Sequence, residues 1–539
     1  MAVTPRDTDP RTDTPAVSAT APAGHPRRWL ILLVMSLCMF VATLDNTILT
    51  VALAPIQQAL NATNGELQWV MDAYALTFAA LLFTAGLLGD RFGRRWVLAG
   101  GLLIFLIASA FASWSTDPTQ LIIWRGLMGL GAAVVPGCSM AVIIDTFVPE
   151  ERPKAIALWS VATGVGIAAG PVVGGALLAS FWWGSALLVN VPLALVAIVL
   201  IVWLVPQRRA EHPVPLDLPG MLLSVLAVGS LVYGIIAGGE GGSWTAPEVA
   251  GPIAAGLVLL VVLILVERRS DNPSIDPELF RSPRFTAGSG VLACSFFVAM
   301  GIGFILTFYL QQVRGNSPVE AGLLTLAYAV GTTVAGAKSS QLADRIGPSA
   351  TVAVGMTAMA AGCLGLSGLG EHTPVWLVEL TQFVFGAGFG LTLAPALAVA
   401  LSVVPAAKAG AGSAVVNTVR HLGSALGVAV LGAVLGVVYR NRFGDGAGLF
   451  SHSQQAAETN SLGSTLMRLA QLRATDHDVT PEALAAAAAH AKDSFLTAMQ
   501  AASWIGAGLC LLAGLIALRW LPGRPPHSGH RAARDHHDR

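Results

Sequence analysis

Apolar segments long enough to cross a lipid bilayer follow one another along most of the chain. A helix of about 20 apolar residues spans the hydrocarbon core. Fourteen segments meet this requirement, and they are residues 29–58, 67–89, 95–114, 119–145, 154–180, 185–205, 217–238, 249–267, 285–313, 318–341, 349–369, 374–402, 409–439 and 494–521. The pattern therefore predicts an all-α membrane protein with 14 transmembrane helices.

Three stretches interrupt this pattern. Residues 1–28 and 522–539 are polar, and we expect both to be solvated tails. Residues 440–493 form a long connection in which an Ala-rich run, Leu484–Ala491, has helix propensity but little to bury. We expect this connection to be a partly helical excursion on the outer face. The first apolar segment is too long for a cleaved signal peptide.

The basic residues predict the orientation of the helices. Lys and Arg gather in the cytoplasmic loops of membrane proteins. If the N-terminus is cytoplasmic, the inner connections and the final tail hold Arg91, Arg94, Arg95, Arg152, Lys154, Arg208, Arg209, Arg268, Arg269, Arg281, Arg284, Arg345, Lys408, Arg524 and Arg531. Among the short outer loops only the one with Arg314 carries a basic residue. This alternation favours an even number of helices in the cytoplasmic membrane, with both termini inside.

Composition supports a membrane protein and excludes several other classes. The chain is 54% hydrophobic and 12% charged with a formal net charge of zero, so nothing favours nucleic-acid binding. Its five cysteines all lie inside apolar segments, which argues against a disulfide framework or a metal site. No Walker A motif and no catalytic triad is present. We therefore expect neither an enzyme nor a cofactor, and ATP is not the expected energy source.

A cluster of charge and glycine, GLLGDRFGRR at Gly86–Arg95, separates the second and third apolar segments. Such charge is costly in hydrocarbon, so we expect a tight loop on one face of the membrane. A weaker copy, SQLADRIG at Ser340–Gly347, follows the tenth segment. The two copies indicate an internal duplication.

Two ionisable residues lie deep within apolar segments, Asp45 in the first and Arg125 in the fourth. A charge there is costly unless it meets a cavity, a partner or a proton. We interpret Asp45 as the first candidate for protonation or cation binding. Arg125 needs a carboxylate or several carbonyls. The alternatives are that Asp45 only hydrogen-bonds a neighbouring helix and that Arg125 is purely structural.

The fifth apolar segment carries glycines at intervals of four. Gly166, Gly170 and Gly174 share one helix face and let a neighbouring helix approach closely, while Pro171 removes a backbone hydrogen bond and can kink the helix. Such a face can slide or rock against its neighbour. Ordinary close packing is the alternative.

These motifs resemble signatures of the major facilitator superfamily, and within it the branch of fourteen-helix drug:proton antiporters. The signature of the loop between helices 2 and 3 is matched by Gly86, Leu88, Asp90, Arg91, Gly93, Arg94 and Arg95. The antiporter signature of helix 5 is matched by Gly166, Gly170, Pro171, Gly174 and Gly175. The segment Leu44–Ile56 is similar to the branch's first-helix signature, with Thr50 where Asn is usual and Pro55 one place late.

Further matches support the same resemblance. The family's proton-relay signature resembles the segment around Arg125 and Gly129, with Met128 where Gln is common. Shorter stretches that recur in the branch are Trp69–Tyr74, Asn190–Pro192, Asp217–Gly220, Tyr309–Gln311 and Asn417–Gly427. The resemblance covers nearly the whole span from Trp29 to Leu521.

The resemblance implies a major facilitator fold with two six-helix bundles, residues 29–206 and 285–521, that rock about a midplane cavity. An inserted helix pair would lie within residues 207–284. The implied function is export of lipophilic, cationic or neutral drugs or antibiotics in exchange for protons, with no cofactor and no metal. We expect a monomer whose partners are a small-molecule substrate, protons and membrane lipid.

Site residues follow from the same resemblance. It assigns proton coupling to Asp45 and Arg125. The cytoplasmic gating loop would be formed by Gly86, Asp90, Arg91, Gly93, Arg94 and Arg95. The candidates for the wall of the substrate cavity are ionisable, amide and aromatic side chains, namely Asp72, Tyr74, Phe78, Phe296, Phe304, Phe308, Glu379, Asn417 and Arg420.

Other interpretations stay open. Asp72 and Glu379 can as readily lie at the membrane interface as in the cavity wall. Each aromatic candidate can equally face lipid or pack against neighbouring helices. A dedicated exporter of one endogenous metabolite, such as a self-resistance pump, fits the sequence too. A non-transporting sensor or scaffold would keep the topology but would not need Asp45 and Arg125 in hydrocarbon. An importer is disfavoured by the helix 5 signature.

Overall fold

The computed structural model describes residues 26–148, 151–207, 218–239, 243–269, 278–404, 409–444, 461–475 and 480–523. Across these ranges the chain is helical and contains no strand. Both expected tails lie mostly outside the described residues, as do Arg208, Arg209 and Lys408 of the inner connections. The burial of Gly86 and the side chain of Asp90 are also outside the described part, although the backbone of both residues belongs to a helix.

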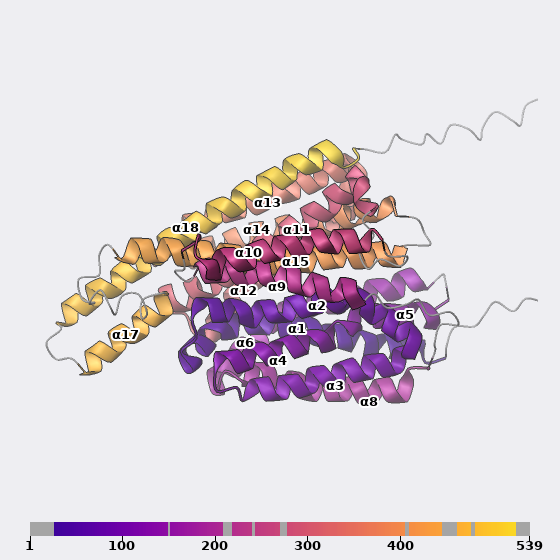
Figure 1. Ribbon diagram of the computed structural model, residues 1–539, viewed down its shortest axis with the longest axis horizontal. Helices are drawn as coiled ribbons and strands as arrows, with labels where there is room; N and C mark the ends of the chain where they lie inside the picture. Colours follow the sequence, from indigo (N-terminus) through magenta and orange to yellow (C-terminus); the bar gives the residue numbers. More distant parts are fainter. Residues whose placement is uncertain are drawn as a thin grey trace, which may run out of the picture.

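The helices form two groups with a pair between them (Figure 1). The first group is α1 (Arg28–Leu60), α2 (Asn64–Phe92), α3 (Arg94–Ser113), α4 (Pro118–Ala132), α5 (Val134–Thr146), α6 (Arg152–Ser180), α7 (Ser185–Leu188) and α8 (Asn190–Leu204). The pair is α9 (Leu218–Gly239) and α10 (Pro247–Glu267). The second group is η1 (Leu279–Arg281), α11 (Pro283–Phe308), η2 (Tyr309–Val313), α12 (Pro318–Ile346), α13 (Pro348–Ser367), α14 (Val375–Ser402), α15 (Ala409–Gly444), α17 (Leu462–Thr475) and α18 (Pro481–Trp520).

Thirteen segments of the described chain are long and apolar enough to cross a membrane. In three of them two helical elements form one span, namely α4 with α5, α7 with α8, and α11 with η2. The helix α2 is not among the thirteen, although it is 29 residues long. The all-helical, multi-span architecture is thus confirmed, whereas the count of fourteen stays a prediction.

The two charged motifs that indicate a duplication have the same backbone geometry. The helix α2 continues through Asp90 and Arg91 to Phe92, and only Gly93, at φ 97°, separates it from α3. Gly347, at φ 94°, separates α12 from α13 in the same way. A positive φ favours glycine, which explains why both turns use it. The expected loop at Gly86–Arg95 is therefore wrong in extent, because most of it is helix.

Packing defines the two groups. In the first, α1 packs on α6, α2 on α4, and α3 on α4 and α8. In the second, α12 packs on α14, α11 on α15, and α13 on α14 and α18. The groups meet where α2 contacts α15 and where α6 contacts α12. The inserted helix α9 packs on α10 and also touches α2 and α15, so it covers a seam between the groups.

The long connection after α15 extends one end of the molecule, at the left of Figure 1. There α17 and the first turns of α18 project beyond the other helices, and α18 runs without a break for 40 residues. The expectation that the Ala-rich run has little to bury fits Ala485, Ala486 and Ala489, which are exposed, but not the two ends of the run. Leu484 and Ala491 are 8% and 0% exposed, and the ring of His490 stacks on Phe443 of α15.

Candidate functional site

The centre of the first group holds a buried ion pair. The Oδ2 atom of Asp45, on α1, lies 2.7 Å from Nη1 of Arg125, on α4, and both side chains are 0% exposed. The other carboxylate oxygen, Oδ1, accepts a hydrogen bond of 2.7 Å from Nδ2 of Asn190. Two residues singled out in the sequence are therefore in direct contact, and a third residue completes the carboxylate's hydrogen bonds.

Arg125 has further partners on α2 and on its own helix. Its Nε donates to the carbonyl oxygen of Val70 at 3.1 Å, and its guanidinium lies 4.5 Å from the ring centroid of Tyr74. Nη1 also reaches Sδ of Met128 at 3.8 Å, a weak acceptor. Its Nη2 is buried without a hydrogen-bond partner among the described residues. The cation is thus held by one charge, one carbonyl and one aromatic face.

Asn190 contacts Asp45 from the first position of α8. The short helix α7 ends at Leu188, and α8 starts at Asn190, two residues before Pro192. The Asn190 side chain lies 0% exposed, with Nδ2 also 3.5 Å from Oγ of Ser109 on α3. The sequence showed Asn190 only as part of a short family match. No local pattern indicates a contact between residues 145 positions apart.

Burial makes this ion pair sensitive to the loss of either member. Two charges removed from water lose hydration, and the pair compensates for this only when both partners and their hydrogen bonds are in place. Removing one partner of such a pair costs about 3–5 kcal/mol, since a charge is left uncompensated. Any event that neutralises Asp45 therefore changes what holds Arg125 in position.

The glycine face of α6 packs directly on α1. A Cβ atom added at Gly170 would overlap Oγ1 of Thr47, and one added at Gly174 would lie 2.8 Å from Ile48 Cγ1. Thr47 Oγ1 in turn donates to the carbonyl oxygen of Gly166 at 3.2 Å. The predicted close approach is present two residues after Asp45.

The same motif touches the second group on another face. A Cβ at Gly175 would lie 2.7 Å from Cα of Val319, and one at Gly322 would overlap the carbonyl oxygen of Pro171. The backbones of α6 and α12 are thus in contact around Pro171. The motif therefore lies both against α1 and at the boundary between the two groups.

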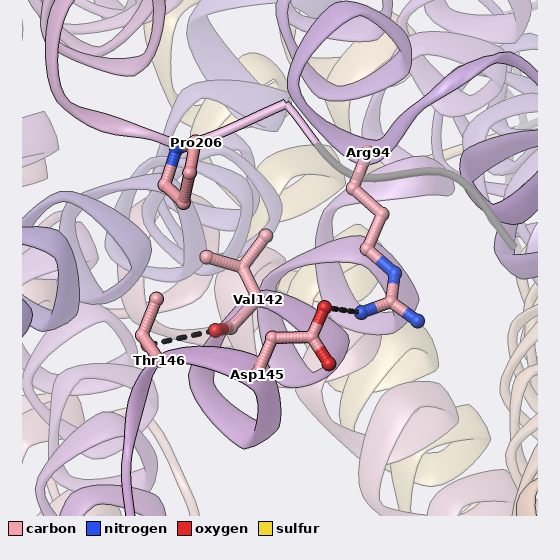
Figure 2. A pocket seen from close by; sticks show the side chains of 5 residues that line it. All are labelled: Arg94, Val142, Asp145, Thr146 and Pro206. Atoms are coloured by element: carbon pink, nitrogen blue, oxygen red, sulfur yellow. Dashed lines mark hydrogen bonds and ion pairs between the residues drawn. The ribbon is translucent and has the colours of Figure 1, made fainter. Parts of the chain in front are cut away.

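A second charged contact lies at the end of the first group where α2 meets α3. Nη1 of Arg94 contacts Oδ2 of Asp145 on α5 and donates to the carbonyl oxygen of Ala141 at 3.1 Å. Figure 2 shows the small hollow at this place, lined by Arg94, Val142, Asp145, Thr146 and Pro206. Arg95 donates to the carbonyl oxygen of Val202 on α8. These two arginines of the expected gating loop tie the α2–α3 turn to α5 and α8, whereas Arg91 is exposed beside the Phe92 ring.

Aromatic candidates lie along the boundary and inside the second group. Tyr74 and Phe78 of α2 stack at 5.8 Å, and the Phe78 ring lies 4.4 Å from that of His421 on α15. Phe304 and Phe308 of α11 are 0% and 2% exposed and contact each other at 5.1 Å. Tyr74 therefore joins the Asp45 site, while Phe304 and Phe308 lie in the core of the second group.

The remaining ionisable candidates have different surroundings. Asp72 is 1% exposed, and its Oδ2 has no hydrogen-bond partner in the described chain. Glu379 is exposed on α14, among the exposed apolar side chains of Trp376, Leu380 and Phe383. Glu379 is therefore on the outer surface of the second group, and the structure does not bring it to the other candidates.

Comparison with known proteins places these features in a family context. Residues 35–428 match the model of the Major Facilitator Superfamily. The chain is 35% identical to the puromycin resistance protein pur8 of Streptomyces alboniger, over 78% of this chain and 84% of that protein. It is 33% identical to the multidrug efflux pump LfrA of Mycolicibacterium smegmatis, over 83% of this chain and 88% of that one.

A solved structure has the same fold. It is a bacterial homologue of the human lysosomal transporter Spinster, with a TM-score of 0.61 at 19% identity, covering 93% of this chain and 99% of that chain. At this identity the likeness concerns the arrangement of the helices alone.

Proposed function

The chain belongs to the Major Facilitator Superfamily, and from this premise we propose that it exports lipophilic drugs or antibiotics in exchange for protons. Membership makes it a multi-pass membrane transporter and not an enzyme, as expected from the sequence. Its similarity to resistance and efflux proteins supports outward transport of drugs. Cationic and neutral compounds are the proposed substrates, because Asp45 and Asp72 place two buried carboxyl groups in the first group.

The observation that carries the proton coupling is the Asp45–Arg125–Asn190 contact. Protonation of Asp45 would remove the negative charge that Arg125 pairs with. The guanidinium would then keep the Val70 carbonyl, the Tyr74 ring and the weak contact with Met128 Sδ, none of which carries a negative charge. The group therefore has two arrangements, and binding or release of one proton selects between them.

Exchange follows if the protonated and the drug-bound states exclude each other. A proton that moves down a membrane potential of 100 mV releases about 2.3 kcal/mol. A carrier that turns outward only with a drug bound, and turns back inward only with a proton bound, uses this energy to move the drug outward. Tyr74 and Phe78 provide aromatic surface next to Asp45 and at the boundary with α15.

Rocking of the two helix groups is the proposed motion, with residues 29–206 and 285–521 as the moving bundles. The contacts that would change are those between α6 and α12 and between α2 and α15. At the contact between α6 and α12, Gly175 lies against the backbone of Val319 and Gly322 against that of Pro171, so these helices approach with little side-chain interdigitation. The Arg94–Asp145 contact would hold the α2–α3 turn during this motion.

The proposed location is the cytoplasmic membrane with both termini inside. Arg94 and Arg95 lie at the end of the molecule where α1 starts, and so does Arg28, which pairs with Glu151 at 2.7 Å. The accumulation of basic residues at one end fits the cytoplasmic side. A cysteine labelled with an impermeant reagent in the α17 segment would test the orientation.

The test of the proposed function is the substitution Asp45→Asn. We expect uncoupler-sensitive transport of a fluorescent cation such as ethidium into inside-out vesicles to fall at least ten-fold. Asp117→Asn is the matched control. Asp117 is an exposed N-cap residue of α4, and Asn caps a helix equally well. Unchanged, uncoupler-insensitive transport by the Asp45→Asn chain would refute the coupling.

A further inference from the structure

A second guanidinium lies inside the second group, and no anionic partner for it is present in the part of the chain that the structure describes. Arg420 on α15 lies 4.8 Å from the ring centroid of Phe296 on α11. Its Nε is buried and unpartnered, and its side chain makes no hydrogen bond or ion pair with any described residue. A charge within a membrane helix is costly without compensation, so this arrangement requires an explanation.

The contrast with Arg125 shows what is missing. Each guanidinium lies over one aromatic ring, Tyr74 for Arg125 and Phe296 for Arg420. Arg125 also has the carboxylate of Asp45 at 2.7 Å and the carbonyl oxygen of Val70. Arg420 lacks both kinds of contact in the described chain. Among the described residues, one of these arginines thus has a counter-charge and the other does not.

Aromatic side chains from three helices continue from Arg420. The Phe296 ring meets that of Phe389, on α14, edge to face at 5.0 Å. Tyr328 of α12 lies 6.1 Å from Phe389 and 5.9 Å from Phe385. Helices α11, α14 and α12 therefore contribute a continuous row of aromatic rings that begins at Phe296, beside Arg420.

This part of α15 faces the first group. The His421 ring contacts that of Phe78 at a tilt of 49°, and Thr418 Oγ1 donates to the carbonyl oxygen of Ala79 at 3.5 Å, so both contact α2. Arg420, Phe296 and Tyr328 are only half-buried, although each lies well inside its helix. Arg420 therefore lies next to the boundary where the proposed function places the substrate.

We propose that Arg420 binds the carboxylate of a transported compound, while Phe296, Tyr328 and Phe389 pack on that compound's aromatic part. The planar guanidinium matches a carboxylate with two parallel hydrogen bonds, and the rings add apolar contact. This inference rests on the proposed export function. It extends the substrate class from cationic and neutral compounds to lipophilic aromatic acids and zwitterions.

Equilibrium binding tests the inference without any proton gradient. The probes are one lipophilic fluorophore with a free carboxylate and its methyl ester, measured by fluorescence anisotropy on the full chain in lipid nanodiscs. We expect Arg420→Gln to weaken binding of the carboxylate probe at least ten-fold and that of the ester less than two-fold. Arg281→Gln is the matched control, because the Arg281 side chain is 80% exposed and pairs only with Glu278.

A competition measurement on the unaltered chain guards against loss of folding in the variant. We expect 1-naphthoate to displace the carboxylate probe at a concentration at least ten-fold lower than its uncharged isostere 1-naphthamide needs. Equal displacement, or equal loss of both probes in the Arg420→Gln chain, would overturn the inference. Binding needs no gradient. A chain that prefers the carboxylate probe but shows no proton-coupled transport would therefore refute the proposed function and leave the inference about Arg420 standing.

Discussion

Gln312 of η2 donates from Nε2 to Oε1 of Gln57 on α1 at 2.8 Å, and this bond joins the two helix groups. Gln57 uses its own Nε2 to contact Asn64 Oδ1 at 3.2 Å and Ser461 Oγ at 3.3 Å. A Cβ atom at Gly463, at the start of α17, would overlap Gln57 Oε1. One glutamine thus connects α1, the second group and the projecting segment at the same end of the molecule.

Replacing Gln57 by Leu should make α1, η2 and α17 separate from one another more often at this end of the molecule. The change leaves buried amide and hydroxyl groups without their partner, at a cost of about 1–3 kcal/mol to the closed arrangement. A cysteine introduced at Leu462, which is 2% exposed, reports the opening through its rate of maleimide labelling. We expect the Gln57→Leu substitution to raise this rate at least five-fold.

Gln120→Leu serves as the control in the same background, since Gln120 is exposed and contacts only the backbone of Thr116 at the start of α4. Equal labelling rates in the two chains would contradict a role of Gln57 in closing the α17 end.

The Asp45–Arg125 pair should show strong coupling in a double-mutant cycle. Asp45→Asn or Arg125→Gln alone leaves a buried partner uncompensated and should cost about 3–5 kcal/mol of stability. The double substitution removes both charges, so we expect its cost to fall well below the sum of the two. Unfolding of the purified chains in detergent, followed by tryptophan fluorescence, measures all four corners of the cycle. Additive costs would show that the two side chains do not stabilise each other.

Much of the helical arrangement could be predicted, because a bilayer demands about 20 apolar residues per helix and a turn after each. The bounds of α6, predicted as 154–180 and observed as Arg152–Ser180, illustrate this. The end of α2 was missed because charge was taken as the end of a helix. Arg91 in the last turn favours a helix C-terminus, and the turn needs only Gly93.

The candidate site could be predicted only in part. Asp45 and Arg125 stand out because charge is rare in apolar segments, but nothing local shows that they touch or that Asn190 joins them. The sequence left open, for a related reason, whether Glu379 lines a cavity or lies at the membrane interface. The helix α14 is apolar around its whole circumference, so the sequence does not reveal which face points inward.

Exchanging the charges of Arg94 and Asp145 should separate the role of this pair from that of either charge alone. Both side chains are partly exposed, at 21% and 27%, so the pair should contribute less than about 1 kcal/mol to stability. Arg94→Asp would place two carboxylates together and should reduce transport of the fluorescent cation at least five-fold. Adding Asp145→Arg should restore more than half of the rate. A doubly exchanged chain as slow as the Arg94→Asp chain would mean that Arg94 acts through its contact with Ala141 instead.

Two glycines of α6, six residues apart, provide the sharpest test of close helix packing. At Gly170 an added Cβ would overlap Thr47 Oγ1 and lie 2.8 Å from the backbone nitrogen of Ile48, whereas at Gly164 nothing lies within 4 Å. Gly170→Ala must therefore push α6 away from α1 beside Asp45. Overpacking of this kind costs about 1–3 kcal/mol. We expect a lower Tm and at least ten-fold slower transport.

Gly164→Ala adds the same methyl group to the same helix without a clash. Alanine favours a helix over glycine by about 1 kcal/mol, so stability should be kept or increased. Thermal unfolding and vesicle transport, measured side by side for the two variants, show whether the lack of space at Gly170 limits transport. If both substitutions left transport unchanged, the contact between α6 and α1 would not limit the motion. If both abolished transport, helix flexibility conferred by glycine, and not the space at Gly170, would be what the transporter requires.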